Sequence, residues 1–149
     1  MNKTTNRTKR GGYISFILFY CKLHKKGYKY IAKYLYWVNR LVFCCDIPPT
    51  VAIGKNLILP HYGLGVVIHP NTVIGDNVRI YQSVTIGSRI PGKGCIVEIR
   101  NNVMLGAGCK ILGSDHLIIG DGVKVGANSV VLKSIKNNVT VVGIPAVEK

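Results

Sequence analysis

Large aliphatic residues recur every six positions through the middle of the chain. One series holds Ile68, Ile74, Ile80 and Ile86, and a second series two residues earlier holds Val66, Thr72, Val78 and Val84. A helix would repeat every three to four residues and a strand every two, so neither element explains this period. A six-residue repeat is the signature of a parallel β-helix, in which each repeat forms one face of a three-sided coil.

Both series return further along the chain. The first continues as Ile99, Leu105, Ile111, Ile119, Val125 and Val131, and the second as Val97, Val103, Cys109, Leu117, Val123 and Ser129. We expect these side chains to point inward and to stack into a narrow core. Breaks in the period predict three loops: a glycine-rich bulge around His61, a longer loop within 87–97, and a two-residue bulge before Leu117. After Val131 we expect the chain to leave the coil as an extended tail.

The first 45 residues differ from the rest. Residues 31–45 have apolar and aromatic side chains at helical spacing, and the apolar run 13–23 is too short to span a membrane. Pro48 and Pro49, which follow Asp46 and Ile47, end the helical region. We therefore predict two parts: a basic, aromatic helical extension over 1–45, and a β-helix domain over 46–149 with a short C-terminal tail.

Charge is concentrated in the extension. The net charge is +14, and ten of the 20 lysines and arginines precede Asp46, where there is no acidic residue. Cations mixed with Tyr, Trp and Phe suit peripheral contact with an anionic membrane. Alternatively, these helices cover the open end of the β-helix or pack in an oligomer. Nucleic acid is not an expected partner, because the basic segment carries no binding motif.

The five cysteines lack metal-type spacing, and we interpret them as reduced thiols of a cytoplasmic protein. No metal site is expected.

Candidate acid–base chemistry is limited to His61 in its bulge and Asp46 fifteen residues earlier. Each coil takes about eighteen residues, so two such positions can return to neighbouring places on successive turns. A carboxylate beside an imidazole fixes its tautomer, and the free nitrogen can then take a proton from a hydroxyl. The same pair could instead make a structural hydrogen bond.

Six motifs in order, DIPP, HYGLGVVI, QSVTIG, NNVMLGAGCKILG, VKVGANSVVLK and VGIPA, resemble the serine acetyltransferase branch of the hexapeptide-repeat acyltransferases. The resemblance covers roughly 41–147. It implies a left-handed β-helix, a homotrimer, and acetyl-CoA as acyl donor in a groove between prisms. It places Asp46 and His61 on the family's catalytic pair, with direct attack of the acceptor hydroxyl on the thioester and backbone amides near Gly87 steadying the oxyanion.

For the coenzyme, the resemblance places Gly87, Ala107 and Ala127 along the pantetheine arm and Lys124 near the phosphates or the adenine. On the acceptor side the chain departs from the family. Pro60 replaces an aspartate before the histidine, and Cys95 and Ile96 replace an arginine–histidine pair that contacts the serine carboxylate. The family's large acidic N-terminal domain is also replaced by the basic extension.

These departures lead to the expectation of a sugar hydroxyl of a cell-envelope polysaccharide, or its precursor, as acceptor, as in the short relatives from polysaccharide clusters. Acetylation of L-serine is the alternative, with Arg89 and Lys93 as candidate substrate-binding residues that replace the missing carboxylate partners. A third hypothesis is a β-helix that has lost catalysis and organises partners.

Overall fold

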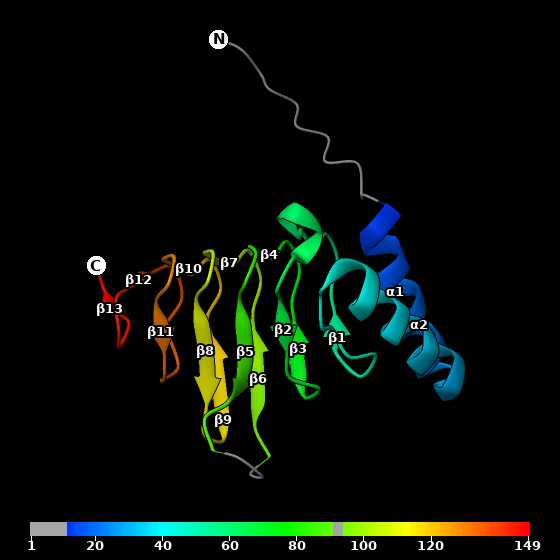
Figure 1. The fold of residues 1–149 in the computed structure, drawn as a ribbon. Helices are drawn as coiled ribbons and strands as arrows, with labels where there is room; N and C mark the ends of the chain where they lie inside the picture. The colour runs from blue at the N-terminus through cyan, green and yellow to red at the C-terminus, as the bar shows by residue number, and fades with distance from the viewer. Residues whose placement is uncertain (1–11, 91–93) are drawn as a thin grey trace.

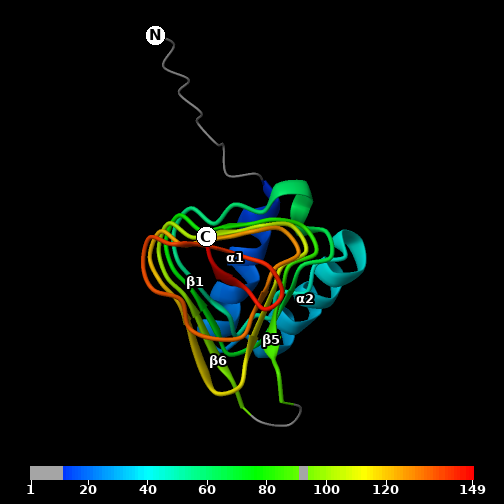
Figure 2. The ribbon, with the colours of Figure 1, turned by 90° about the vertical axis from the view of Figure 1, so that its left-hand side faces the viewer.

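The chain forms a three-sided prism of stacked coils with two helices at its N-terminal end (Figure 1). The computed structural model describes residues 12–90 and 94–149. Viewed along the prism, successive coils superpose as nested triangles (Figure 2). The fold is the predicted left-handed parallel β-helix.

Each face of the prism is one sheet of short strands. The first sheet has the order β1-β3-β6-β9, with β1 Ala52–Ile53, β3 Thr72–Ile74, β6 Ile96–Ile99 and β9 His116–Ile119. The second has the order β13-β12-β10-β7-β4, with β13 Val147–Glu148, β12 Thr140–Val142, β10 Lys124–Val125, β7 Met104–Leu105 and β4 Arg79–Ile80. The third has the order β11-β8-β5-β2, with β11 Val130–Val131, β8 Lys110–Gly113, β5 Thr85–Ser88 and β2 Val67–Ile68.

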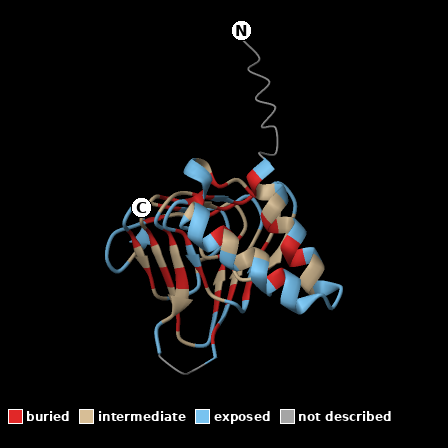
Figure 3. Cartoon of the chain, turned by 45° about the vertical axis from the view of Figure 1, so that its right-hand side comes forward, coloured by how far each residue is buried: buried red, intermediate tan, exposed pale blue. Residues whose placement is uncertain are grey.

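The predicted inward series form the core. In register, Ile80 pairs with Leu105, which pairs with Val125, so one aliphatic side chain per coil stacks on the next. Every member of both series, from Val66 to Val131, is buried. The core is therefore a column of side chains running the length of the prism. Buried positions recur on successive coils in Figure 3.

The breaks in the period form loops where they were expected. The bulge around His61 contains a short 3₁₀ helix, η1 (Pro60–Gly63), and the two-residue bulge separates β8 from β9. The long loop begins after β5 and ends before β6; residues 91–93 lie outside the described part of the chain.

At the C-terminus the sequence-based prediction was wrong. The coil does not end at Val131, because Ile135 bridges Ile119 and β12 pairs in parallel with β10, with Val141 buried beside Val125. The chain then turns back as β13, which pairs antiparallel with β12 and ends the sheet.

Helix α1 (Gly12–Lys25) and helix α2 (Lys29–Phe43) pack together at the N-terminal end of the prism. Ile17 and Tyr20 of α1 are fully buried and belong to the same core as the coils. The Tyr20 hydroxyl donates to the Ile47 carbonyl at 2.8 Å. The helices therefore cover the open end of the prism, one of the three roles expected for them. In the described ranges, neither helix is long and apolar enough to cross a membrane.

Candidate active site

His61 projects from the prism on η1, in an unusual backbone conformation. Pro60 occupies the start of η1, and both His61 (φ 54°) and Tyr62 (φ 56°) are left-handed. For a residue with a Cβ this conformation costs about 1–2 kcal/mol. Such costs concentrate at functional sites, where the surrounding structure holds the residue in place. The His61 side chain is therefore exposed on a loop whose left-handed backbone is unfavourable for both His61 and Tyr62.

A groove of about 440 Å³ brings His61 together with Ala107 and Ala127. The stacking of coils explains this, because Ala107 and Ala127 both lie two residues beyond paired core positions of β7 and β10. Both therefore occupy the same corner of the prism, where their small side chains leave a channel. Gly106 is required beside them, since a Cβ there would lie 2.7 Å from the Ala127 nitrogen.

The two other predicted coenzyme residues, Lys124 and Gly87, do not line this groove themselves. Lys124 is exposed on β10, and its register partner Met104 lines the groove. Gly87 lies on β5 in the adjoining sheet, paired with Leu112. The structure therefore brings His61, Ala107 and Ala127 into one groove with Lys124 at its side, and places Gly87 on the neighbouring face.

Of the two predicted acceptor residues, the structure describes only Arg89, at the start of the long loop. Arg89 is exposed directly after β5, and its backbone N–H donates to the Gly113 carbonyl at 2.7 Å. Lys93 lies outside the described residues. Of the positions that depart from the family, Cys95 is buried and Ile96 begins β6 with an exposed side chain.

Asp46 is held by helix α2. Its backbone bridges Val67 of β2, and its carboxylate accepts a 2.6 Å hydrogen bond from the Tyr36 hydroxyl at Oδ1. The Arg40 guanidinium lies 3.4 Å from Oδ2. Within the described residues no hydrogen bond or ion pair joins Asp46 to His61, so their catalytic pairing stays a prediction.

Two neighbours of Asp46, Tyr36 and Cys45, have raised pKa values that keep them uncharged beside the carboxylate. Burial, followed by the hydrogen bond to Asp46 and its negative charge, raises the pKa of Tyr36. The phenol is therefore protonated at neutral pH and remains a donor to the carboxylate. Next to Asp46, burial chiefly raises the pKa of the Cys45 thiol to about 11, which keeps that neighbour uncharged.

Sequence reasoning missed two groups near the site. Tyr36 and Arg40 lie one helical turn apart on α2, a spacing that signals a shared face without indicating what that face contacts. The second group is a cluster of rings beside His61, in which Tyr62 lies 5.7 Å from Tyr13 and 6.1 Å from Phe43 between ring centroids. It ties the His61 loop to both helices. Across 12–90 and 94–149, no group of three or more His, Cys, Asp or Glu side chains is arranged to hold a metal ion.

Known proteins resemble this chain in sequence and fold. No protein-family profile matches it. A serine acetyltransferase of Helicobacter pylori is 42% identical over 125 residues, which cover 83% of this chain and 71% of the relative. A crystal structure of the Brucella abortus serine acetyltransferase in complex with coenzyme A has a TM-score of 0.84 and 38% identity, covering 91% of this chain and 53% of that one.

The serine acetyltransferase of Neisseria gonorrhoeae in complex with serine gives a TM-score of 0.82 and 34% identity, again over 91% of this chain and 54% of that one. The chain thus spans little more than half the length of these solved structures. The names of these relatives correct the expectation of a sugar acceptor, because they support serine acetylation, the alternative reading, and not a polysaccharide enzyme. With 42% identity across most of both proteins and the same left-handed β-helix, the chain belongs to the serine acetyltransferase family of hexapeptide-repeat acyltransferases.

Proposed function

We propose that this protein transfers the acetyl group of acetyl-CoA to the hydroxyl of L-serine, with His61 as general base. The observation that carries the proposal is the groove that holds His61 together with Ala107 and Ala127. The relatives named serine acetyltransferase, and the solved structures with coenzyme A and with serine, support both substrates.

His61 is suited to the proton transfer. Its imidazole is exposed at the groove and, among described residues, has no hydrogen-bond or ion-pair partner, so a ring nitrogen is free to accept a proton. His61 removes the serine hydroxyl proton while that oxygen attacks the thioester carbonyl. The carbon–sulfur bond then breaks, and the coenzyme thiolate takes the proton from the imidazolium. No acyl-enzyme is required.

The donor is bound along the prism corner. Ala107 and Ala127 leave room for the pantetheine arm to lie against backbone groups of successive coils. Lys124 supplies a positive charge beside the same groove, suited to a phosphate of the coenzyme. Gly87, on the adjoining face, offers backbone without a side chain at the end nearest the long loop.

Serine must be bound here by residues other than those that bind it in the family. Serine carries a carboxylate and an amine, and Pro60, Cys95 and Ile96 offer no charge to either. We propose that Arg89 pairs with the carboxylate, with Lys93 in the same loop as a second cation. An Arg fork matches a carboxylate with two parallel hydrogen bonds, which makes it the better candidate of the two.

The oligomeric state and the cellular location of the protein are also proposed. We propose a homotrimer in which a second copy closes the groove, and a cytoplasmic protein, since all five cysteines are free thiols. The peripheral membrane contact expected from the basic extension is part of the same proposal. Light scattering in solution should give three times the chain mass, and a stable monomer would contradict the trimer.

The experiment that tests the acceptor is direct detection of product. Incubation with acetyl-CoA and L-serine should yield O-acetylserine by mass spectrometry. Arg89→Gln should raise the KM for serine and leave the KM for acetyl-CoA unchanged. Lys133→Gln, a matched exposed cation near the other end of the prism, should change neither. Absence of O-acetylserine would contradict serine as acceptor, and an unchanged KM in Arg89→Gln would remove that residue from the site.

A further inference from the structure

Helix α2 carries a second apolar face whose large side chains are exposed in the described part of the chain. Its inner face, with Ala32 and Asn39 buried, covers the prism end. Its outer face exposes large rings and aliphatic chains, including Tyr30 at 92%, Leu41 at 77% and Trp37 at 45% exposure. The full outer set is Tyr30, Ile31, Tyr34, Trp37, Leu41 and Val42. A surface helix that serves only as a cover would show polar residues there.

Cations border this outer face along one side. At helical spacing, Lys29, Lys33 and Arg40 form a line beside the exposed rings, and the Arg40 guanidinium lies 5.2 Å from the centre of the Trp37 ring. Lys25 and Lys26 continue the positive charge into the turn between the helices. Asp46 partly neutralises Arg40, but no acidic residue precedes Asp46, so the four lysines Lys25, Lys26, Lys29 and Lys33 leave this surface with a net positive charge.

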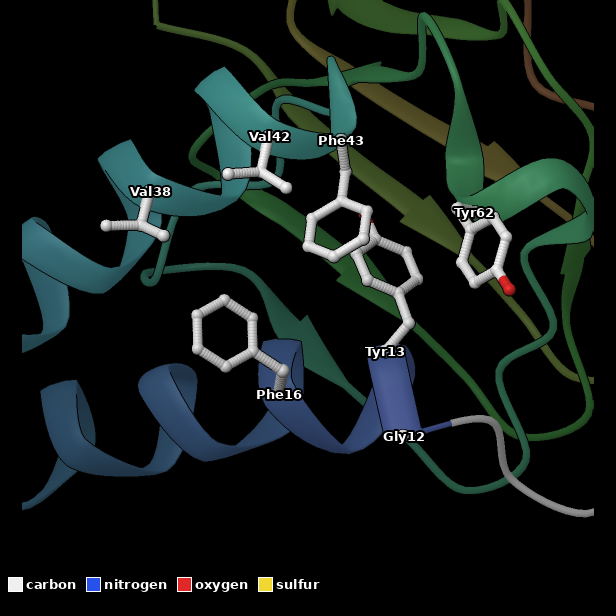
Figure 4. A pocket seen from close by; sticks show the side chains of 7 residues that line it. All are labelled: Gly12, Tyr13, Phe16, Val38, Val42, Phe43 and Tyr62. Carbon is white, nitrogen blue, oxygen red and sulfur yellow. The ribbon is translucent and has the colours of Figure 1, made fainter.

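An apolar groove of about 400 Å³ extends the outer face toward the active-site loop. Val38 and Val42 of α2 form one wall, Phe16 of α1 faces them, and Tyr62 closes the end beside His61 (Figure 4). The apolar surface is therefore continuous from the outer face of α2 to η1. The lining is predominantly apolar, so the groove suits an acyl chain better than a polar group.

We infer that the outer face of α2 docks on an anionic membrane surface, with Trp37, Tyr34 and Leu41 entering the headgroup region and the bordering cations meeting anionic lipid. Trp and Tyr rings favour this interface, and each nearby cation adds attraction to anionic headgroups. With 15 residues, α2 is roughly 22 Å long, which suits a helix lying in the plane of the interface and not one crossing it.

A second copy of the chain is the competing occupant. Two such faces brought together would oppose cation to cation, with no carboxylate on either to pair with them. The nearest carboxylate, Asp46, already interacts with Tyr36 and Arg40. Charge therefore favours the anionic lipid surface. This inference deepens the membrane contact included in the proposed function, but it does not depend on acetyl transfer, since no residue of the outer face lines the His61 groove.

The chain offers a built-in probe, because Trp37 is its only tryptophan. Mixing the full-length protein with vesicles of phosphatidylglycerol and phosphatidylcholine should shift tryptophan emission to shorter wavelength, and high salt should reverse the shift. Vesicles of phosphatidylcholine alone should produce little change. No shift with anionic vesicles would overturn the inference.

Two matched double variants distinguish the effect of net charge from that of the α2 lysines. The double substitution Lys29→Gln and Lys33→Gln should weaken vesicle binding about tenfold or more. The control Lys55→Gln and Lys136→Gln removes the same net charge from exposed sites outside α2 and should bind as the wild type does. Equal losses of vesicle binding in the two double variants would show that only net charge matters, and would overturn the assignment of the outer face of α2 as the docking surface. If Leu41→Ser instead lowers the mass seen by light scattering, the face joins copies of the chain and the inference is also overturned.

Discussion

The Tyr36 hydroxyl donates a 2.6 Å hydrogen bond to the Asp46 carboxylate and so joins helix α2 to the first coil of the β-helix. Arg40, one turn further along α2, lies against the other carboxylate oxygen, and the Asn39 amide donates to the Cys45 carbonyl at 2.7 Å. The N-terminal extension is therefore bonded to the residue that the family resemblance makes part of the catalytic pair. If Asp46 pairs with His61 as the resemblance implies, changes in α2 should alter catalysis through this contact.

Removing the Tyr36 hydroxyl tests that connection. A hydrogen bond to a charged group contributes about 1.5–3 kcal/mol, so Tyr36→Phe should lower the free energy of unfolding by an amount near the lower end of that range, given partial exposure. Urea unfolding followed by circular dichroism measures this change. Tyr34→Phe on the exposed side of the same helix is the matched control, and it should change stability by less than about 0.5 kcal/mol. Equal effects of the two variants would show that the Tyr36 bond contributes nothing.

Filling the prism corner should block the donor. Ala127→Trp places a large ring in the groove that also holds His61 and Ala107, so the KM for acetyl-CoA should rise at least about tenfold, the factor that 1.4 kcal/mol of lost binding produces. Val73→Trp, on an exposed position of another face, controls for added bulk and should leave the KM unchanged. Steady-state kinetics at saturating serine makes the comparison. An unchanged KM in Ala127→Trp would mean that acetyl-CoA binds elsewhere.

Thiol reactivity should separate one cysteine from the other four. Burial raises the pKa of Cys21 and Cys109 to about 12, and it also chiefly raises the pKa of Cys45 and Cys95. A raised pKa lowers the thiolate fraction at pH 8, and the thiolate is the reactive form. Exposed Cys44 should therefore react rapidly with Ellman's reagent, and the other four should react only on unfolding.

The control for this titration is Cys44→Ser. The substitution should abolish the rapid phase and leave the remaining four thiols to react in denaturant. A rapid phase that persists in Cys44→Ser would show that a second thiol is accessible, and the packing of the coil around Cys95 or Cys109 would need revision.

The periodic part of the fold was predictable because one physical requirement acts at every coil. A side chain at the Ile80, Leu105 or Val125 position has to fill the same inward space, so the sequence repeats what the structure repeats. The last turn escaped prediction because its spacing changes. Ile135 follows Val131 by four residues and Val141 follows Ile135 by six, yet both still return to the coil.

The site was predictable only where it follows the repeat. The bulge that holds His61 interrupts the period and so left a signal in the sequence, whereas Ala107 and Ala127 were singled out only by the family resemblance, and the structure places them at equivalent positions of successive coils. The contacts of Asp46 left no signal in the sequence, because they depend on how α2 is oriented against the first coil. Periodicity shows that a helix has two faces, but the packing of Tyr36 against Asp46 decides which face is inward.

The measurement that tests the central claim most directly is the initial rate of coenzyme A release from acetyl-CoA, with and without L-serine, in wild type and His61→Ala. General acid–base catalysis contributes about 100- to 10,000-fold, so the serine-dependent rate should fall by that factor in His61→Ala. Vesicle binding and the unfolding curve of the variant should match those of the wild type. A wild-type rate that serine does not raise would contradict the proposed acceptor, and a serine-dependent rate that survives in His61→Ala would remove His61 from the mechanism.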